Sequence, residues 1–514
     1  MQQHYLKLLT VLVLILTTGI APADQANLTP PAGFDKQAYI AGARTNTVLR
    51  IARVDCIAYA LNNNIEVKIK RIQPRLREDD VRIARSVFDP GLTAEAMLTD
   101  TTELSPNLIY GTNLSVLRVG DIKAGVGGKL WTGTRYDLNV DINRLKSSSP
   151  TQIINPAYGM EPQITLTQPL LRGAGIAVNR AAIVITRNNL RISIKNVRDT
   201  VMDIISRTLV AYYDLYYARA QYAIETDALE RTRRLLEINQ ARYAKGLISS
   251  VDLLETKASV AERQKRVIAA EATMKTAEDA LKLVTNLVDD PALWNARVEL
   301  LEEPVLSLQK IDLAQSLEQA FANRPDYQAM QFALANRDIQ IMVARNGLLP
   351  TVDLIGSFGL NGLGEDMGAA ADNANMDYKD WLLGVRVTVP WGRDDRARYD
   401  QSKWEKMQAI LELKRLEQDI IFIIRKRVRD VDIQYRQTEA SILAAEMETE
   451  NYAAQQERYA AGQVSTHDML DYQNRLASAR LDYIKAMIDY QITLIRLNQA
   501  EGVTLAKNNI TLEN

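Results

Sequence analysis

The stretches "RYAKGLISSVDLL" (residues 242–254) and "RYAAGQVSTHDML" (residues 458–470) repeat one short pattern at two distant points of the chain. In each stretch a lone Gly is followed three residues later by a Ser and six residues later by an Asp. Gly readily takes the left-handed conformation that ends many helices. Ser caps the start of a helix, and an Asp in the first turn adds favourable charge. Each stretch therefore predicts the tip of a helical hairpin.

The segments on both sides of each tip lack helix-breaking residues. Gly and Pro are absent from residues 176–245, 247–290, 393–461 and 463–501, which are rich in Ala, Leu, Glu and Arg. Such composition predicts four uninterrupted helices. At about 1.5 Å per residue the first would extend roughly 100 Å, far more than an ordinary domain needs.

A seven-residue apolar repeat runs through both helices that follow the tips. Its members are Leu253, Val260, Val267, Met274 and Leu281, and then Met469, Leu476, Tyr483, Tyr490 and Leu497. This period is typical of a left-handed coiled coil. The intervening positions hold small residues, Ala270, Ala277, Ala479 and Ala486, which allow helices to approach closely. We expect two antiparallel coiled-coil hairpins.

The two halves of the chain are related throughout. Residues 60–92 align with residues 320–352 without a gap, which places Asn63 with Asn323 and Pro90 with Pro350. The sequence offset between the two tips is smaller than the offset between these two aligned stretches. The first half therefore carries extra residues, most of them between Pro90 and Pro169. The sequence therefore predicts two structural repeats.

Each repeat contains a region of a different character. "YDLNVDIN" (136–143), "PQITLT" (162–167) and "VRVTV" (385–389) alternate apolar and polar residues, which is typical of strands with two unlike faces. Prolines bracket both regions, and Pro suits a junction between helix and strand because it cannot donate to either. The predicted junctions are Pro90, Pro169, Pro350 and Pro390. Four main strands cannot close a barrel alone, so strands that enter a bilayer must be pooled by an oligomer.

Composition and chemistry-bearing residues exclude several classes of function. The 62 basic side chains balance 63 acidic ones, which argues against nucleic-acid binding. Lys7, the apolar run of residues 8–16 and the "APA" of residues 21–23 predict a cleaved signal peptide. Beyond it remain one His and one Cys, His467 and Cys56, too few for a His/Cys metal cluster in one chain. We expect no cofactor, no metal and no enzyme activity.

The chain resembles the outer-membrane efflux protein family, the TolC-like channels. The resemblance covers nearly the whole mature chain and is carried by "VRIARSVFDPGL" (81–92), "LTQPLLRGAG" (166–175), "NRPDYQA" (323–329), "ARNGLLPTVDL" (344–354) and the two tips. It implies an α+β membrane protein in which three protomers pool four strands each into one β-barrel. The long helices would continue that barrel as a coiled-coil α-helical barrel across the periplasm.

One region departs from the family pattern. The first strand region contains additional segments in which apolar and polar residues alternate, "LSVLRVGDIK" (114–123) and "GGKLWTGTRYDLNVDIN" (127–143). An extra hairpin, a long outer loop and a barrel extension are all compatible with it.

The resemblance also assigns residues to roles near the tips. It implies a pore constriction of Asp468 and Asp471, which share a helix face. The alternative is that both are solvated acids at a helix start. It further implies gate links of Asp252 and Tyr459, two residues that could hydrogen-bond. His467, beside Asp468, is either a pH sensor or incidental. The adaptor-contacting residues would be Gly246, Leu247 and Gly462.

The expected function is an outer-membrane channel of a tripartite efflux or type I secretion system in a Gram-negative bacterium. It would be a homotrimer in contact with outer-membrane lipid, a periplasmic adaptor (membrane fusion) protein and an inner-membrane transporter. The alternative is a soluble periplasmic coiled-coil adaptor or scaffold. The cargo is not readable from the residues.

The expected organisation assigns every part of the chain. The segments are residues 1–23, signal peptide; 24–49, N-terminal periplasmic segment; 50–89, helix of repeat 1; 90–169, strands of repeat 1; 170–290, long hairpin with tip 242–252; 291–349, equatorial segment and helix of repeat 2; 350–390, strands of repeat 2; 391–501, long hairpin with tip 458–468; and 502–514, C-terminal tail.

Overall fold

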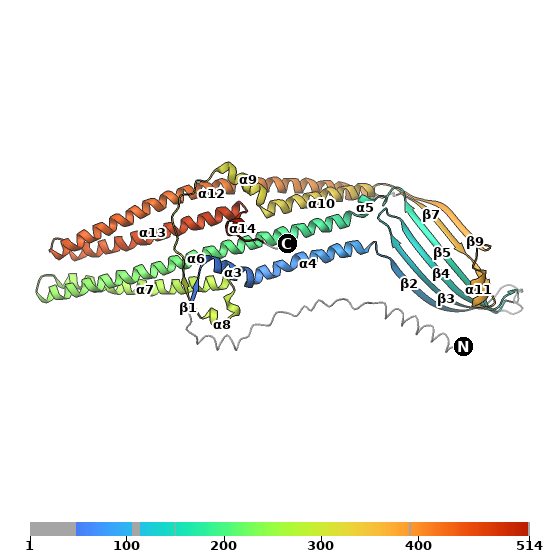
Figure 1. The fold of residues 1–514 in the computed structure, drawn as a ribbon, viewed down its shortest axis with the longest axis horizontal. Coiled ribbons are helices and arrows are strands. Elements are labelled where there is room, and N and C mark those ends of the chain that lie inside the picture. Colours follow the sequence, from blue (N-terminus) through green and yellow to red (C-terminus); the bar gives the residue numbers. More distant parts are fainter. Residues whose placement is uncertain (1–47, 105–113, 150, 390–391, 512–514) are drawn as a thin grey trace. The chain divides into compact units, whose positions relative to one another are not determined.

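A computed structural model describes residues 48–104, 114–149, 151–389 and 392–511 (Figure 1). The predicted signal peptide and Pro390 lie outside the described residues. The described residues fall into two units, residues 48–49 with 287–299 and residues 50–286 with 300–511. The described part of the smaller unit holds η2 (Leu287–Asp289), α8 (Pro291–Trp294) and most of β6 (Arg297–Leu300), and β6 pairs with β1 (Val48–Ile51).

The larger unit holds two successive sets of helices in the same order. The first set is α3 (Arg53–Asn63), α4 (Ile65–Ser86), α6 (Ala181–Ala244) and α7 (Ser250–Val284); the second is α9 (Leu313–Asn323), α10 (Pro325–Gly347), α12 (Asp394–Ala460) and α13 (Thr466–Ala500). The short helices are α5 (Ile176–Asn179), α11 (Met367–Asn373) and α14 (Thr504–Lys507). Since α6 and α12 span 64 and 67 residues, the prediction of very long helices is confirmed.

Two helix ends differ from the prediction. The first long segment is broken at Arg180, which separates α5 from α6. The helix expected to run to residue 290 ends at Val284 instead. There Asn286 takes a left-handed φ of 54°, and its side-chain amide donates a hydrogen bond to the carbonyl of Asn63. A contact with a distant part of the chain therefore sets this end.

Helix α6 is the centre of the helical packing, because it contacts α4, α7, α10 and α13. The hairpins α6–α7 and α12–α13 lie side by side, with their tips at the same end (Figure 1). The heptad residues of α13 are the more buried set, with Met469, Leu476, Tyr490 and Leu497 all in the core. Among the helices of the described residues, none carries the apolar run that crossing a membrane requires.

In the part of the chain that the structure describes, seven strands form one antiparallel sheet at the opposite end of the larger unit from the tips (Figure 1). They are β2 (Gly91–Leu104), β3 (Leu114–Lys129), β4 (Arg135–Ser147), β5 (Ala157–Pro169), β7 (Thr351–Leu360), β8 (Gly362–Gly364) and β9 (Lys379–Thr388). The order is β2-β3-β4-β5-β7-β9, and β8 pairs with β5 beyond the end of β7. Among its described residues, the first strand region therefore holds four strands, two of them in an extra hairpin, β2–β3.

The strand register gives this sheet two unlike faces. Because side chains alternate across a strand, residues that are register partners share a face. Apolar residues line one face, and many are exposed: Leu92, Leu98, Val126, Leu138, Ile164, Phe358, Trp381, Leu383 and Val385. The other face is polar and includes Thr93, Glu95, Lys123, Asn139, Asp141, Gln163 and Asp380. A large apolar face open on a sheet needs a covering environment.

Two of the described junction prolines stand between helix and strand, and the third ends a strand. Pro90 follows α4 and precedes β2, and Pro350 follows α10 and precedes β7. Pro169 is the last residue of β5, where its register partner is Asp353. The ladder continues for one more bond, from the amide of Leu170 to the carbonyl of Val352 at 2.7 Å.

Candidate functional sites at the helical tips and the sheet

Both tips are built by the same helix-ending motif. Gly246 and Gly462 have φ values of 71° and 76°, as their place after a helix predicts. At the first tip the amides of Gly246 and Leu247 donate to the carbonyls of Tyr243 and Arg242, both at 2.9 Å. The amides of Gly462 and Gln463 do the same with the two corresponding carbonyls of α12. This is the Schellman pattern, which satisfies the last carbonyls of a helix.

The helices that follow are capped as the sequence predicts. The Ser249 hydroxyl accepts from the amide of Asp252 at 3.1 Å, and the Asp252 carboxylate accepts from the amide of Ser249 at 3.0 Å. At the second tip the Ser465 hydroxyl accepts from the amide of Asp468 at 3.1 Å. The bonds from Ser249 hold the pKa of Asp252 below its usual value. At both tips, therefore, the end of one helix and the start of the next are capped by hydrogen bonds.

A buried polar cluster lies beneath the second tip and corrects one expectation. The Tyr459 hydroxyl donates to Asn239 Oδ1 and lies 3.2 Å from Thr466 Oγ1. Asn239 in turn donates to Thr256 Oγ1 at 2.9 Å. Tyr459 is 4% exposed, and Asp252 is bonded to Ser249, so the expected Tyr459–Asp252 hydrogen bond is wrong within this chain.

Arg242 joins the two hairpins across their tips, a role that the sequence reasoning missed. Its guanidinium donates to the carbonyls of Tyr459 and Ala460 at 2.9 and 3.3 Å and lies 4.6 Å from the centre of the Tyr459 ring. A cation at the carbonyl end of a helix is electrostatically favourable. Because an Arg occurs at the same place in both repeated stretches, the sequence marked Arg242 as a candidate. Its partner could not be predicted, since Tyr459 lies 217 residues away.

A second polar link between the hairpins is exposed. Nδ1 of His467 lies 2.7 Å from Oε1 of Glu255, which joins α13 to α7. The hydrogen bond and charge of Glu255 raise the pKa of His467, and Asp468 and Asp471 act in the same direction. Three nearby acidic side chains therefore favour the charged form of His467, for which a sensing role and an incidental role are both left open by the sequence.

The two predicted constriction residues lie in the first turns of α13 with different partners. Asp468 is exposed and accepts from the Ser465 hydroxyl at 2.7 Å. Asp471 forms an ion pair with Arg475 Nε at 2.8 Å. One carboxylate is therefore hydrogen-bonded by a neutral group, and the other is partly neutralised by a cation.

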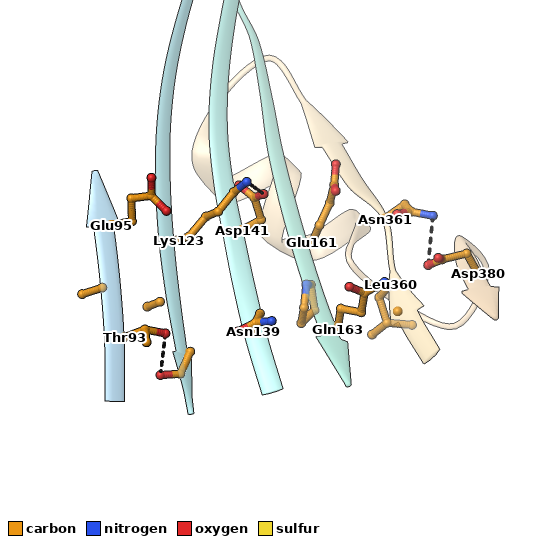
Figure 2. Close-up of a pocket in the computed structure, with 15 residues that line it drawn as sticks. Thr93, Glu95, Lys123, Asn139, Asp141, Glu161, Gln163, Leu360, Asn361 and Asp380 are labelled. Carbon is orange, nitrogen blue, oxygen red and sulfur yellow. Dashed lines mark hydrogen bonds and ion pairs between the residues drawn. The ribbon is translucent and has the colours of Figure 1, made fainter. Parts of the chain in front are cut away.

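A hollow on the polar face of the sheet gathers further charged groups. Figure 2 shows Glu95, Lys123, Asp141 and Glu161 in one row across neighbouring strands. Lys123 Nζ lies 3.3 Å from Asp141 Oδ2. The remaining polar residues of the lining are Thr93, Asn139, Gln163, Asn361 and Asp380.

Small residues on the polar face let long side chains fold over them. A Cβ added to Gly125 would lie 2.0 Å from Asn139 Oδ1, and one added to Gly359 would lie 2.6 Å from Asp380 Oδ1. The side chains of Asn139 and Asp380 therefore lie across the glycines of the neighbouring strands on this face.

The described residues hold no cluster of three or more His, Cys, Asp or Glu arranged to bind a metal ion. The Cys56 side chain is buried, and this burial raises the pKa of its thiol to about 12. The thiolate, which is the reactive form, is therefore scarce at neutral pH.

Comparison with known proteins assigns this architecture. The family model of the outer membrane efflux protein matches residues 136–287 and 316–503, more than half of the chain. The chain belongs to the outer membrane efflux protein family. It is an outer-membrane efflux channel of a Gram-negative bacterium, and the family match gives the soluble-adaptor alternative no support.

Curated relatives and solved structures agree with this family. The outer membrane efflux protein BepC of Brucella suis is 25% identical over 400 residues, which cover 71% of this chain and 83% of BepC. The outer membrane protein TolC of Vibrio cholerae is 22% identical over 325 residues, 60% of this chain and 70% of TolC. The crystal structure of the Campylobacter jejuni CmeC outer membrane channel has a TM-score of 0.65 at 17% identity, covering 88% of this chain and 86% of CmeC.

Proposed function

We propose that three copies of this efflux channel form one passive duct. In this proposal the sheets of the three copies close into a β-barrel in the outer membrane. The long hairpins form an α-helical barrel that reaches into the periplasm, and each chain contributes two structural repeats. The duct moves solutes by opening and closing and catalyses no reaction.

The two-faced sheet with open edges is the observation that carries this proposal. Its apolar face is exposed over several strands, as a face toward lipid would be. Its edge strands, β2 and β9, are each paired on one side only among the described residues. Unpaired strand edges are not tolerated in the hydrocarbon region, so closure with further copies satisfies both requirements together.

The tips are the proposed docking points for a periplasmic adaptor and, through it, an inner-membrane transporter. They lie at the opposite end of the larger unit from the sheet (Figure 1). Leu247 at the first tip is 69% exposed, and Gly246 and Gly462 have open space where a side chain would stand. Polypeptide secretion and small-molecule efflux both remain compatible with such a duct.

Location and assembly are tested by membrane fractionation followed by unheated and heated detergent gels. We expect the mature chain in the outer-membrane fraction as a heat-sensitive trimer. A soluble monomer would overturn the proposal. A deletion strain complemented with this chain then reports whether export depends on it.

The proposed constriction is a ring of Asp468 carboxylates, with Asp471 contributing less. Because Asp471 is paired with Arg475, its charge is partly neutralised, whereas the partner of Asp468 is a neutral hydroxyl. Rings of carboxylates favour cations. We expect Asp468→Asn to reduce cation selectivity, measured as reversal potential in planar bilayers.

Asp471→Asn is the matched control, and we expect a smaller reduction from it. Equal effects, or none from Asp468→Asn, would show that both are ordinary acids at a helix start and that the constriction lies elsewhere.

A further inference from the structure

The extra hairpin β2–β3 stands out because its strands are as long as those of the rest of the sheet. β2 and β3 span 14 and 16 residues, against 13 for both β4 and β5. The family match begins at residue 136, inside β4, so the hairpin lies outside the part of the chain that the family model recognises.

The hairpin carries the same two faces as the rest of the sheet. In one row of the register Leu92, Val126 and Leu138 stand together on the apolar face. In the next row Thr93, Gly125 and Asn139 stand together on the polar face. A hairpin lying in water would have no need for an apolar face in phase with the sheet beside it.

The hairpin also determines which edge is open. Along β4 the edge away from β5 is occupied by β3 from Arg135 to Ser147, so β4 has no room there for another strand. Among the described residues the open edges are those of β2 and β9. Each of the six long strands is antiparallel to its neighbour, so β2 and β9 run in opposite directions. β9 of a second copy therefore fits against β2 as one more antiparallel pair.

We infer that β2 of each copy pairs with β9 of the next, so that the barrel wall has six long strands per copy in place of four. The inference rests on the proposed trimer, and three copies of six strands give eighteen. Barrel diameter grows nearly linearly with strand number, so this barrel would be about one and a half times as wide as a twelve-stranded one. Barrels of about 16 to 18 strands leave an aqueous channel, so the outer-membrane end would not be the narrow point of the duct.

The experiment introduces cysteine pairs across the inferred joint. Leu98→Cys on β2 is combined in turn with Trp381→Cys, Leu383→Cys or Val385→Cys on β9, all on the apolar face. After oxidation or treatment with a short bis-maleimide, we expect linked dimers and trimers on heated gels for at least one pair. Each single variant and the parent chain, whose Cys56 is buried, are expected to give none.

A matched set places the first cysteine on β4, as Leu138→Cys, with the same three partners. Because β3 covers β4, we expect no link between copies from this set. Links from β4, or a trimer with no links from β2, would place the hairpin outside the wall and overturn the inference. Absence of any trimer on unheated gels would instead overturn the proposed function.

A second measurement does not depend on the register between copies. Ala96 is exposed on the apolar face of β2, in one row with Ile122 and Ile142, and its neighbour Met97 is on the polar face opposite Asp121. Arg is strongly disfavoured near the middle of a lipid-facing strand and tolerated inside a channel. We expect Ala96→Arg to lower the trimer yield in the outer membrane more than tenfold and Met97→Arg to lower it less than twofold. Equal yields from both variants would mean that the hairpin does not contact lipid.

Discussion

Tyr459 and Tyr243 hold the same place in the two repeated stretches but have different surroundings. Tyr459 is 4% exposed and bonded to Asn239 within a core that also contains Leu235 and Met469. Tyr243, in contrast, is 45% exposed. The difference arises because the two hairpins pack on each other with unlike sides, so equal residues acquire unequal roles.

We therefore expect Tyr459→Phe to destabilise the second tip by about 1–2 kcal/mol, since it leaves a buried Asn239 oxygen without its donor. Tyr243→Phe is the matched control and should change stability little. Hydrogen exchange of the α12 and α13 amides near the tip measures both. Equal protection in the two variants would mean that the buried cluster contributes nothing.

His467 makes the link between the hairpins dependent on pH. Because Glu255 raises its pKa, the charged pair is fully present below the ordinary His pKa of about 6.5 and is lost as pH rises through the raised value. We expect the closed tip to open more often at alkaline pH. The change should be about twofold or less, since both side chains are exposed to solvent.

Single-channel recordings across pH 6 to 8 test this dependence. His467→Gln and Glu255→Gln should each abolish it, because either change removes the charged pair. A parent channel whose open probability is flat across this range would rule the link out as a sensor.

At the scale of the elements, both helices that follow the tips end in corresponding ways. Asn286 after α7 and Gly502 after α13 have φ values of 54° and 73°. Asn286 bonds the carbonyl of Asn63, and Gly502 lies against Asn323, where a Cβ would be 2.9 Å from its carbonyl carbon. Each return helix thus ends beside a break between two shorter helices.

Replacing two prolines by Ala is expected to change the stability of the protein in opposite directions. Pro169 ends β5, where its fixed φ restricts the unfolded chain, so Pro169→Ala should lower stability by about 0.5–1 kcal/mol. Pro74 lies inside α4, where it removes a helical hydrogen bond, so Pro74→Ala should raise stability by about 1 kcal/mol or more.

The temperature at which the trimer dissociates on detergent gels measures both variants. If Pro169→Ala left both this temperature and the trimer yield unchanged, the proposed junction role of Pro169 would be lost. A lower temperature for Pro74→Ala would show that a bend in α4 is required.

At the scale of the whole molecule, the sheet and the helical tips present different kinds of surface. The sheet presents an apolar face and open edges, whereas the tips carry polar links between the hairpins. We expect Leu138→Arg, on the apolar face, to cost about 2–4 kcal/mol where it meets the centre of the bilayer.

Gln163→Arg, on the polar face, is the matched control and should assemble normally. The fraction of chain recovered as trimer in the outer membrane distinguishes the two variants. If both assembled equally well, the apolar face would not be the one that contacts lipid.

The sequence by itself determined the features that depend on local backbone chemistry. The lack of Gly and Pro predicted α6, α12 and α13, and the lone glycines at 246 and 462 predicted both tips with their left-handed φ. These features need only neighbours a few residues away, so periodicity and composition suffice for them. The alternation of apolar and polar residues predicted strands in both regions, but it left the number of strands in the first region open.

Only the tertiary structure decided which distant groups meet. It placed Arg242 on the end of α12, moved Tyr459 from the expected partner Asp252 to Asn239, and added β2–β3 to the edge of β4. Side chains of one type are equally able to bond several partners, and strands with the same alternation can pair in several orders. Packing of the whole chain, in which each contact must fit all the others at once, selects among these options, and no local pattern records that selection.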